Sequence, residues 1–539
     1  MVRPPRVEAG PDIQRARTGI KGLDDILGGG LPTNHLYLID GDPGTGKTTL
    51  ALQFLIEGAN KGERGLYVTL SESKEELAAV AEAHGWSLDK IDIFELSKDA
   101  GTKDLTETYT IFHPAEVELQ QTVDEVLEHV KASNPVRIAF DSLSEMRLLA
   151  REPLRFRRQI LALKQFFNGR DCTVLMLDDK TAPEGDLQLH SLAHGVIVLE
   201  HVALEYGSER RRLQVTKVRG IQFRGGFHDF RIVVGGIEVY PRVLQDEMRI
   251  DVSGETLLSG SKAMDALLGG GITCGTSTLI TGAAGTGKSV LCTQFARSEL
   301  ARGGKVLLYL FDERLATFKM RTQALGMDVE AERESGQLKL IQVEPTELSP
   351  GEFASQVVNA VGNDGVTLVI IDSINGYMQS MPEERLLPIQ IHELLSFLSN
   401  NGCTCIMTLV QHGIFGNPVD EAAEVSYLAD TVMLLRYFEV NGTVRQSISV
   451  VKKRSGNHER NIRECKVQQG GFFVGKPLAE FQGVLTGVPR YIGGSGPLLA
   501  EAPSEEVWDG NERRVQNNPP PDDGALRREP KRTRKKSGR

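Results

Sequence analysis

Two phosphate-binding loops stand out in this sequence, at residues 41–48 and 282–289. Both fit the pattern G-x-x-x-x-G-K-[ST] without a mismatch. The glycines let backbone N–H groups converge on phosphate, and the lysine reaches the β- and γ-phosphates. The sequence therefore predicts two nucleoside triphosphate sites, for ATP with Mg²⁺. The expected ATP-binding residues are Gly41, Gly44, Thr45, Gly46, Lys47, Thr48 and Thr49 in the first loop, and Gly282, Gly285, Thr286, Gly287, Lys288 and Ser289 in the second.

An acidic residue ends an apolar run downstream of each loop. Asp141 follows residues 137–140, and Asp372 follows residues 367–371. A carboxylate in this place holds the Mg²⁺ shell together with the hydroxyl that closes the phosphate loop. The predicted metal ligands are Thr48 and Asp141 in the first half and Ser289 and Asp372 in the second.

Catalysis also needs a carboxylate that orients or deprotonates the attacking hydroxyl or water. The candidates end the expected strand after each loop helix. They are Glu72, preceded by Ser71, in the first half and the adjacent Asp312 and Glu313 in the second. A solvated turn is the alternative reading, but the equivalent positions in the two halves favour catalysis.

Basic residues alternate along an expected late strand of each half. Lys217 and Arg219 form the first pair, and Lys452 and Arg454 form the second. Residues two apart share one face of a strand. Such a pair could bind a phosphate, including that of a neighbouring subunit's nucleotide, or could simply face solvent.

These residues stand in a duplicated α/β unit. Thr18 corresponds to Ser259 and Gly41 corresponds to Gly282, and the two positions of each pair are 241 residues apart. Within each half, continuous apolar strands alternate with helical segments, which predicts a mostly parallel sheet covered on both faces. Residues 195–200 with 213–217, and 431–436 with 447–452, are expected to add antiparallel strands.

The repeat also sets the expected domain organisation. We expect a disordered lead at residues 1–14, a first domain at 15–244, a linker at 245–255, a second domain at 256–491 and a disordered tail at 492–539. The tail is rich in Gly, Pro, Glu and Arg and cannot bury enough apolar area to fold.

Composition narrows the class of protein. The net charge is −10, although residues 527–539 are strongly basic, and an acidic body argues against broad DNA binding. The six cysteines lack metal spacing and favour buried thiols in a reducing compartment. Neither a signal peptide nor an apolar stretch long enough to span a membrane is evident, so we expect a cytoplasmic location.

Together these motifs resemble the KaiC-type circadian clock ATPases, a branch of the RecA-like family. The resemblance covers residues 15–491 and includes the T-G-x-x-G-L-D opening at 18–24, the strand-end acids, the K-x-R strands and the segments 429–437 and 485–490. It implies tandem RecA-like domains, an ATP-dependent homohexameric double ring with nucleotide at subunit interfaces, and KaiB-like or other signalling partners. It also implies a slow ATPase in the first domain and a serine/threonine autokinase in the second.

Aligning the family motifs assigns further residues. Ser426 matches a phosphoacceptor, followed by Tyr427 where the family has threonine. Lys452, Arg454 and His458 match contacts to nucleotide at the second-domain interface. In the first domain Lys217 and Arg219 match, whereas Phe223 replaces a histidine and Ser71 replaces the first acid of the catalytic pair. Since Asp312 is shorter than the family's glutamate, Glu313 is the preferred base.

Two other functions fit the same fold. One is a RecA/RadA-like DNA-dependent ATPase, which the acidic body disfavours. The other is a nucleotide-gated scaffold without kinase activity, which the incomplete acid pair of the first domain favours.

Overall fold

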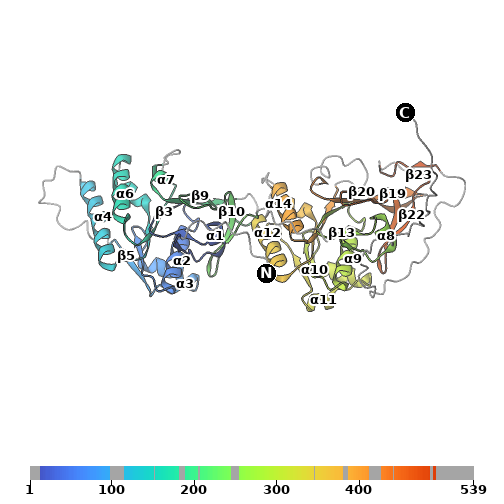
Figure 1. Ribbon diagram of the computed structural model, residues 1–539, viewed down its shortest axis with the longest axis horizontal. Coiled ribbons are helices and arrows are strands. Elements are labelled where there is room, and N and C mark those ends of the chain that lie inside the picture. The colour runs from blue at the N-terminus through green and yellow to red at the C-terminus, as the bar shows by residue number, and fades with distance from the viewer. Residues whose placement is uncertain are drawn as a thin grey trace, which may run out of the picture.

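The computed structural model describes residues 13–96, 114–150, 152–180, 188–203, 207–243, 254–344, 346–379, 387–411, 426–440, 442–485 and 490–492. The chain forms two α/β domains, each built on a nine-stranded sheet (Figure 1). The predicted class of tandem RecA-like domains is confirmed. Most of the expected disordered lead, linker and disordered tail lies outside the described residues.

The two sheets match strand for strand. The first runs β11-β10-β9-β8-β3-β7-β6-β4-β5, and the second runs β22-β21-β20-β19-β14-β18-β17-β15-β16. In both, the strand before the phosphate loop is central. The neighbouring strand, β7 or β18, separates it from the strand that ends in the predicted metal ligand, Asp141 or Asp372. The carboxyl ends of these three parallel strands therefore meet at one edge of each sheet.

The two expected antiparallel pairs are confirmed, because β8 pairs with β9 and β19 pairs with β20 in antiparallel register. β8 and β19 pair in parallel with the central strand on one side and antiparallel with the next strand on the other. The antiparallel part of the first sheet is thus β9, β10 and β11, and that of the second is β20, β21 and β22.

The first domain contains the strands β1 (Arg15–Ala16), β2 (Leu31–Pro32), β3 (Leu36–Gly41), β4 (Gly65–Thr69), β5 (Ile91–Glu95), β6 (Arg137–Asp141), β7 (Thr173–Asp178), β8 (Gly195–Val202), β9 (Arg210–Val218), β10 (Phe227–Val233) and β11 (Gly236–Tyr240). Its helices are α1 (Lys21–Ile26), α2 (Lys47–Asn60), α3 (Lys74–Ala83), α4 (Pro114–Ser133), α5 (Leu143–Ala150), α6 (Pro153–Phe167) and α7 (Gln188–Leu192).

The second domain contains the strands β12 (Thr256–Leu257), β13 (Ile272–Thr273), β14 (Ser277–Gly282), β15 (Val306–Leu310), β16 (Leu338–Gln342), β17 (Leu368–Asp372), β18 (Thr404–Val410), β19 (Thr431–Val440), β20 (Thr443–Lys453), β21 (Arg463–Gln468), β22 (Gly471–Pro477), β23 (Phe481–Gln482) and β24 (Arg490–Tyr491). Its helices are α8 (Lys262–Leu267), α9 (Lys288–Ala301), α10 (Leu315–Ala324), α11 (Glu330–Glu334), α12 (Pro350–Asn359) with a π-helical continuation (Ala360–Asp364), α13 (Ile374–Gln379) and α14 (Leu387–Asn400).

Helices cover both faces of each sheet, which explains the continuous apolar strands. Every residue of β4, β6 and β7 is buried. On one face of the first sheet, Leu50 and Phe54 of α2 join one core cluster. On the other face, Phe156, Ile160 and Leu163 of α6 join a second. Each such side chain stabilises the fold by about 1.5–3 kcal/mol through burial, so the sheet is a rigid support for the loops at its edge.

The two domains meet where β10 lies beside α12 (Figure 1). The N-terminus of α12 is capped by Ser349, whose hydroxyl accepts a hydrogen bond from the Glu352 amide. Asp229 of β10 accepts another from the Gly351 amide at 2.7 Å, and Arg231 donates to both carboxylate oxygens of Glu352 at 3.1 Å. A carboxylate at a helix N-terminus and a forked ion pair are charge-assisted contacts, so this junction is a specific one.

Candidate nucleotide sites

Each phosphate loop joins a buried strand to a long helix. β3 ends at Gly41 and α2 begins at Lys47, with Gly46 in the left-handed region at φ 100°. Lys47 folds back over the loop, and its ammonium donates to the Gly41 and Asp42 carbonyls at 2.8 and 2.9 Å. The Thr45 hydroxyl donates to Asp42 at 2.8 Å. These hydrogen bonds hold the loop between β3 and α2 in a defined conformation.

The second loop repeats this geometry. Lys288, the first residue of α9, donates to the Gly282 and Ala283 carbonyls at 2.8 Å. Thr286 donates to Ala283 at 2.8 Å. Burial lowers the pKa of the Lys288 ammonium, because a buried cation loses solvation by water. The remaining predicted loop residues occupy the turn and the start of the helix, and they are Gly44, Thr48, Thr49, Gly285, Gly287 and Ser289.

The predicted metal ligands come together in both domains. The Thr48 hydroxyl lies 3.3 Å from Asp141 Oδ2, and the Ser289 hydroxyl is hydrogen-bonded to Asp372. Burial raises the pKa of both carboxyl groups. One hydroxyl and one carboxylate beside a phosphate loop fit Mg²⁺, which takes one or two protein oxygens and completes its shell with phosphate and water. Within the described ranges no cluster of three or more His, Cys, Asp or Glu forms a site for a metal held by protein alone.

Glu72 is the strand-end carboxylate of the first domain. Its side chain is half-buried, and its buried Oε2 has no hydrogen-bond partner among the described residues. Burial raises the pKa of Glu72 to about 7, and the charges of Asp141, Glu76 and Asp179 add to the shift. A carboxyl group with this pKa can exchange a proton near neutral pH, as a general base requires.

The two acids of the second-domain pair have different hydrogen-bond partners. Asp312 accepts a hydrogen bond from the Ser373 hydroxyl at 2.5 Å, and its charge acts on Lys288. Glu313, preferred from the sequence, is held by the guanidinium of Arg321 at 3.1 and 2.8 Å. Both carboxylate oxygens of Glu313 are therefore occupied by charge-assisted hydrogen bonds from the guanidinium. Of the two, Asp312 therefore has the more favourable surroundings for a base.

Two carboxylates that the sequence analysis did not select lie at the end of β7. Asp178 pairs with Arg147 at 2.5 Å, and Asp179 Oδ1 lies 2.8 Å from Lys47 Nζ. The sequence does contain a signal for these two acids, because they directly follow the apolar run at residues 172–177. Its meaning depended on the strand order, which places the end of β7 between the phosphate loop and Asp141.

The predicted basic pairs point toward short segments next to each sheet. Lys217 and Arg219 donate to the carbonyls of His190 and Ser191, both in α7. In the second domain, Lys452 donates to the Ser426 and Ala429 carbonyls at 3.0 and 2.7 Å. Arg454 donates to the Tyr427 carbonyl at 3.3 Å.

The predicted phosphoacceptor is thus next to the basic pair. The Ser426 side chain is half-buried, whereas Tyr427 is 53% exposed. His458 is half-buried in the segment that follows β20. Residues 412–425 lie outside the described part of the chain.

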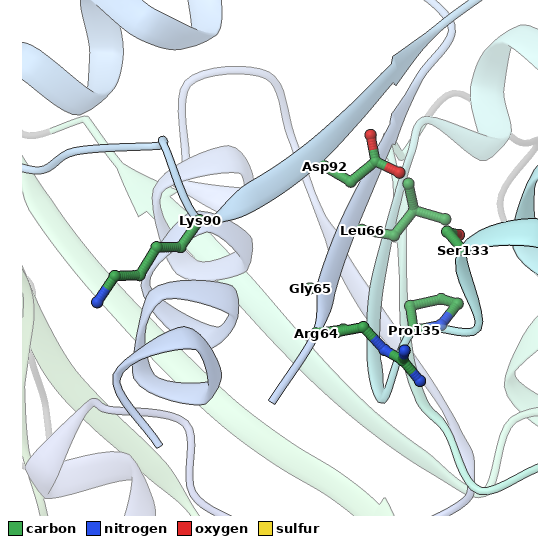
Figure 2. A pocket seen from close by; sticks show the side chains of 7 residues that line it. All are labelled: Arg64, Gly65, Leu66, Lys90, Asp92, Ser133 and Pro135. Carbon is green, nitrogen blue, oxygen red and sulfur yellow. The ribbon is translucent and has the colours of Figure 1, made fainter. Parts of the chain in front are cut away.

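A surface hollow of about 120 Å³ lies elsewhere (Figure 2). Its lining includes Arg64, Gly65 and Asp92, at the amino ends of β4 and β5, and Ser133 at the end of α4. The phosphate loops lie at carboxyl ends of strands, so this hollow belongs to the opposite edge of the first sheet. None of the described helices combines the length and apolar character needed to cross a membrane.

Comparison with known proteins agrees with this architecture. The sequence matches the family described as "ATPase: KaiC" twice, over residues 16–243 and 257–479. It is 25% identical over 490 residues to the circadian clock protein KaiC3 of Synechocystis sp., which covers 89% of this chain and 95% of the relative.

Two circadian clock oscillator proteins KaiC show similar sequence identity and coverage. The one from Acaryochloris marina is 25% identical over 495 residues, with 89% of this chain and 92% of the relative covered. The one from Thermosynechococcus vestitus is 25% identical over 503 residues, with 90% and 94% covered. With both domains matched and a complete phosphate loop in each, the chain belongs to the KaiC ATPase family.

Proposed function

We propose that the first domain hydrolyses ATP and that the second transfers phosphate from ATP to Ser426 of a neighbouring subunit. The observation that carries this proposal is the set of groups at each phosphate loop: a lysine, a hydroxyl–carboxylate pair and a strand-end acid. The relatives are named as clock proteins, and we propose a related timing or signalling role.

In the first domain, Glu72 would act on water. The water oxygen bonds to the γ-phosphorus, the bond from phosphorus to the bridging oxygen breaks, and ADP and phosphate leave. Glu72 accepts the proton released by water, and Lys47 neutralises the phosphate charge. Mg²⁺, held by Thr48 and Asp141, would add electrostatic stabilisation of the phosphates.

In the second domain, the acceptor would be a serine hydroxyl. Its oxygen bonds to the γ-phosphorus as ADP departs, and its proton passes to the acid pair, for which we favour Asp312 over Glu313. Lys452 donates a hydrogen bond to the Ser426 carbonyl, so a positive charge lies next to the proposed phosphoacceptor. If Lys452 and Arg454 also meet a neighbour's nucleotide, the same contact brings Ser426 to that phosphate.

The acceptor assignment is tested by Ser426→Ala. Wild-type protein incubated with Mg-ATP is expected to gain one phosphate at Ser426, measured by intact-mass and phosphopeptide analysis. Ser426→Ala is expected to lose most incorporation, since alanine has no hydroxyl. Tyr427→Phe is the control and should keep it. Undiminished incorporation in Ser426→Ala, or none in wild type, would show that the kinase assignment is wrong and leave ATP hydrolysis standing.

The assembly is tested by Lys47→Ala. If nucleotide bridges subunits of a homohexamer, losing the first-site lysine should weaken ATP binding there and shift the mass measured by light scattering toward smaller species. Lys61→Ala, a change just after the end of the same helix and away from the loop, should leave assembly intact. A wild-type protein that is monomeric at micromolar concentration both with and without ATP would contradict the ring.

A further inference from the structure

The P-loop lysine of the first domain already has a full set of acceptors. An ammonium group has three N–H donors. The Gly41 and Asp42 carbonyls accept two of them, and Asp179 lies 2.8 Å from the same nitrogen. The Lys47 side chain is only 8% exposed. Asp179 is in turn held by the Ser144 hydroxyl, which donates to its other oxygen at 2.9 Å.

The second domain differs at this point. Among the described residues, Lys288 donates to the Gly282 and Ala283 carbonyls, which leaves one of its three donors for a ligand. The two lysines otherwise sit in matching loops, so the difference between the domains lies in the residue that reaches the lysine from the neighbouring strand.

Strand register identifies that residue in the second domain as Val410. The first residue of β3 pairs with Val174, and the first residue of β14 pairs with Cys405. Asp179 and Val410 each stand five positions further along the chain. A carboxylate in one domain therefore corresponds to an apolar side chain in the other.

We propose that Asp179 competes with nucleotide for Lys47, so that a triphosphate must displace it and the first site binds MgATP more weakly than it would with valine there. The lysine has to give its third donor to phosphate, and the displaced carboxylate then stays near an anion of the same sign. Asp141 and Glu72 make that region acidic already. The inference rests on the proposed nucleotide site of the first domain.

The test uses the full chain with Lys288→Ala, which confines binding to the first site. The affinity for Mg-AMP-PNP, a non-hydrolysable ATP analogue, is measured by calorimetry. Asp179→Asn keeps the shape without the charge, and Asp179→Val installs the second-domain residue. Both are expected to bind about tenfold more tightly, which corresponds to about 1.4 kcal/mol. Thermal unfolding of each variant checks that the fold is kept.

The reciprocal change provides an independent arm. Val410→Asp, in a Lys47→Ala background that leaves only the second site, is expected to weaken Mg-AMP-PNP binding about tenfold. Unchanged or weaker binding in folded Asp179 variants would overturn the proposal, as would unchanged binding in Val410→Asp. Absence of any binding in the Lys288→Ala parent would instead contradict the nucleotide site itself.

Discussion

Glu72→Gln is expected to lower ATP turnover at the first-domain site by about 10²- to 10⁴-fold, the usual contribution of a general base. Glutamine keeps the size of the side chain but cannot accept a proton. The measurement is steady-state phosphate release in a Lys288→Ala background, so that the second site does not contribute. Equal turnover with and without the change would show that another group orients the water.

The pH dependence gives the same assignment a second readout. A base works only when ionised, and the pKa of Glu72 is about 7. Turnover should therefore rise as the pH increases from 6 to 8, and this rise should disappear in Glu72→Gln. Glu76→Gln is the matched control. It removes one negative charge that raises the pKa of Glu72, so turnover should persist while the rise moves to lower pH.

Asp312→Asn is expected to reduce phosphate transfer in the second domain by about 10²- to 10⁴-fold, whereas Glu313→Gln should have a smaller effect. The reason is the ion pair that holds Glu313 against Arg321 while Asp312 contacts Ser373. The initial rate of phosphate incorporation at Ser426 measures both variants under identical Mg-ATP.

Arg321→Gln distinguishes the two acids further. If Asp312 is the base, releasing Glu313 from its partner should leave transfer unchanged or lower it through disorder of the pair. A faster reaction in Arg321→Gln, together with loss of transfer in Glu313→Gln and its retention in Asp312→Asn, would establish Glu313 as the base and contradict our assignment.

Much of the fold was accessible from sequence because its signals are local. The phosphate loops fit a pattern with strict glycine and lysine positions, and the duplication repeats at a constant offset. Strands buried on both faces read as continuous apolar runs, so the parallel core was predictable. The expected antiparallel pairs were also correct. That β8 and β19 pair in parallel with the central strand on their other side was not predicted, because it depends on strand order.

The site was less accessible, because it depends on contacts between distant segments. Side-chain length alone favoured Glu313, and its ion pair with Arg321 of α10 could not be read from the sequence. Which of the two acids acts as the base stays a prediction. Asp179 and Lys47 are separated by more than a hundred residues. Only the strand order brings them together, so that an acid at the end of β7 forms an ion pair with the lysine of the phosphate loop.

The junction at β10 connects the two sites through a chain of contacts. A Cβ on Gly46 of the first loop would lie 2.8 Å from Ile232 of β10, and the preceding residue, Arg231, holds Glu352 of α12. The residue after Glu352 packs on Phe311, beside the second acid pair. If occupancy of one site shifts this chain of contacts, the affinity of the other must change, and reciprocity requires the same factor in both directions. The four constants for binding nucleotide at either site, with the other site empty or occupied, then form a closed thermodynamic cycle. The coupling free energy of this cycle is a property of a single subunit and does not require contact with a neighbouring subunit.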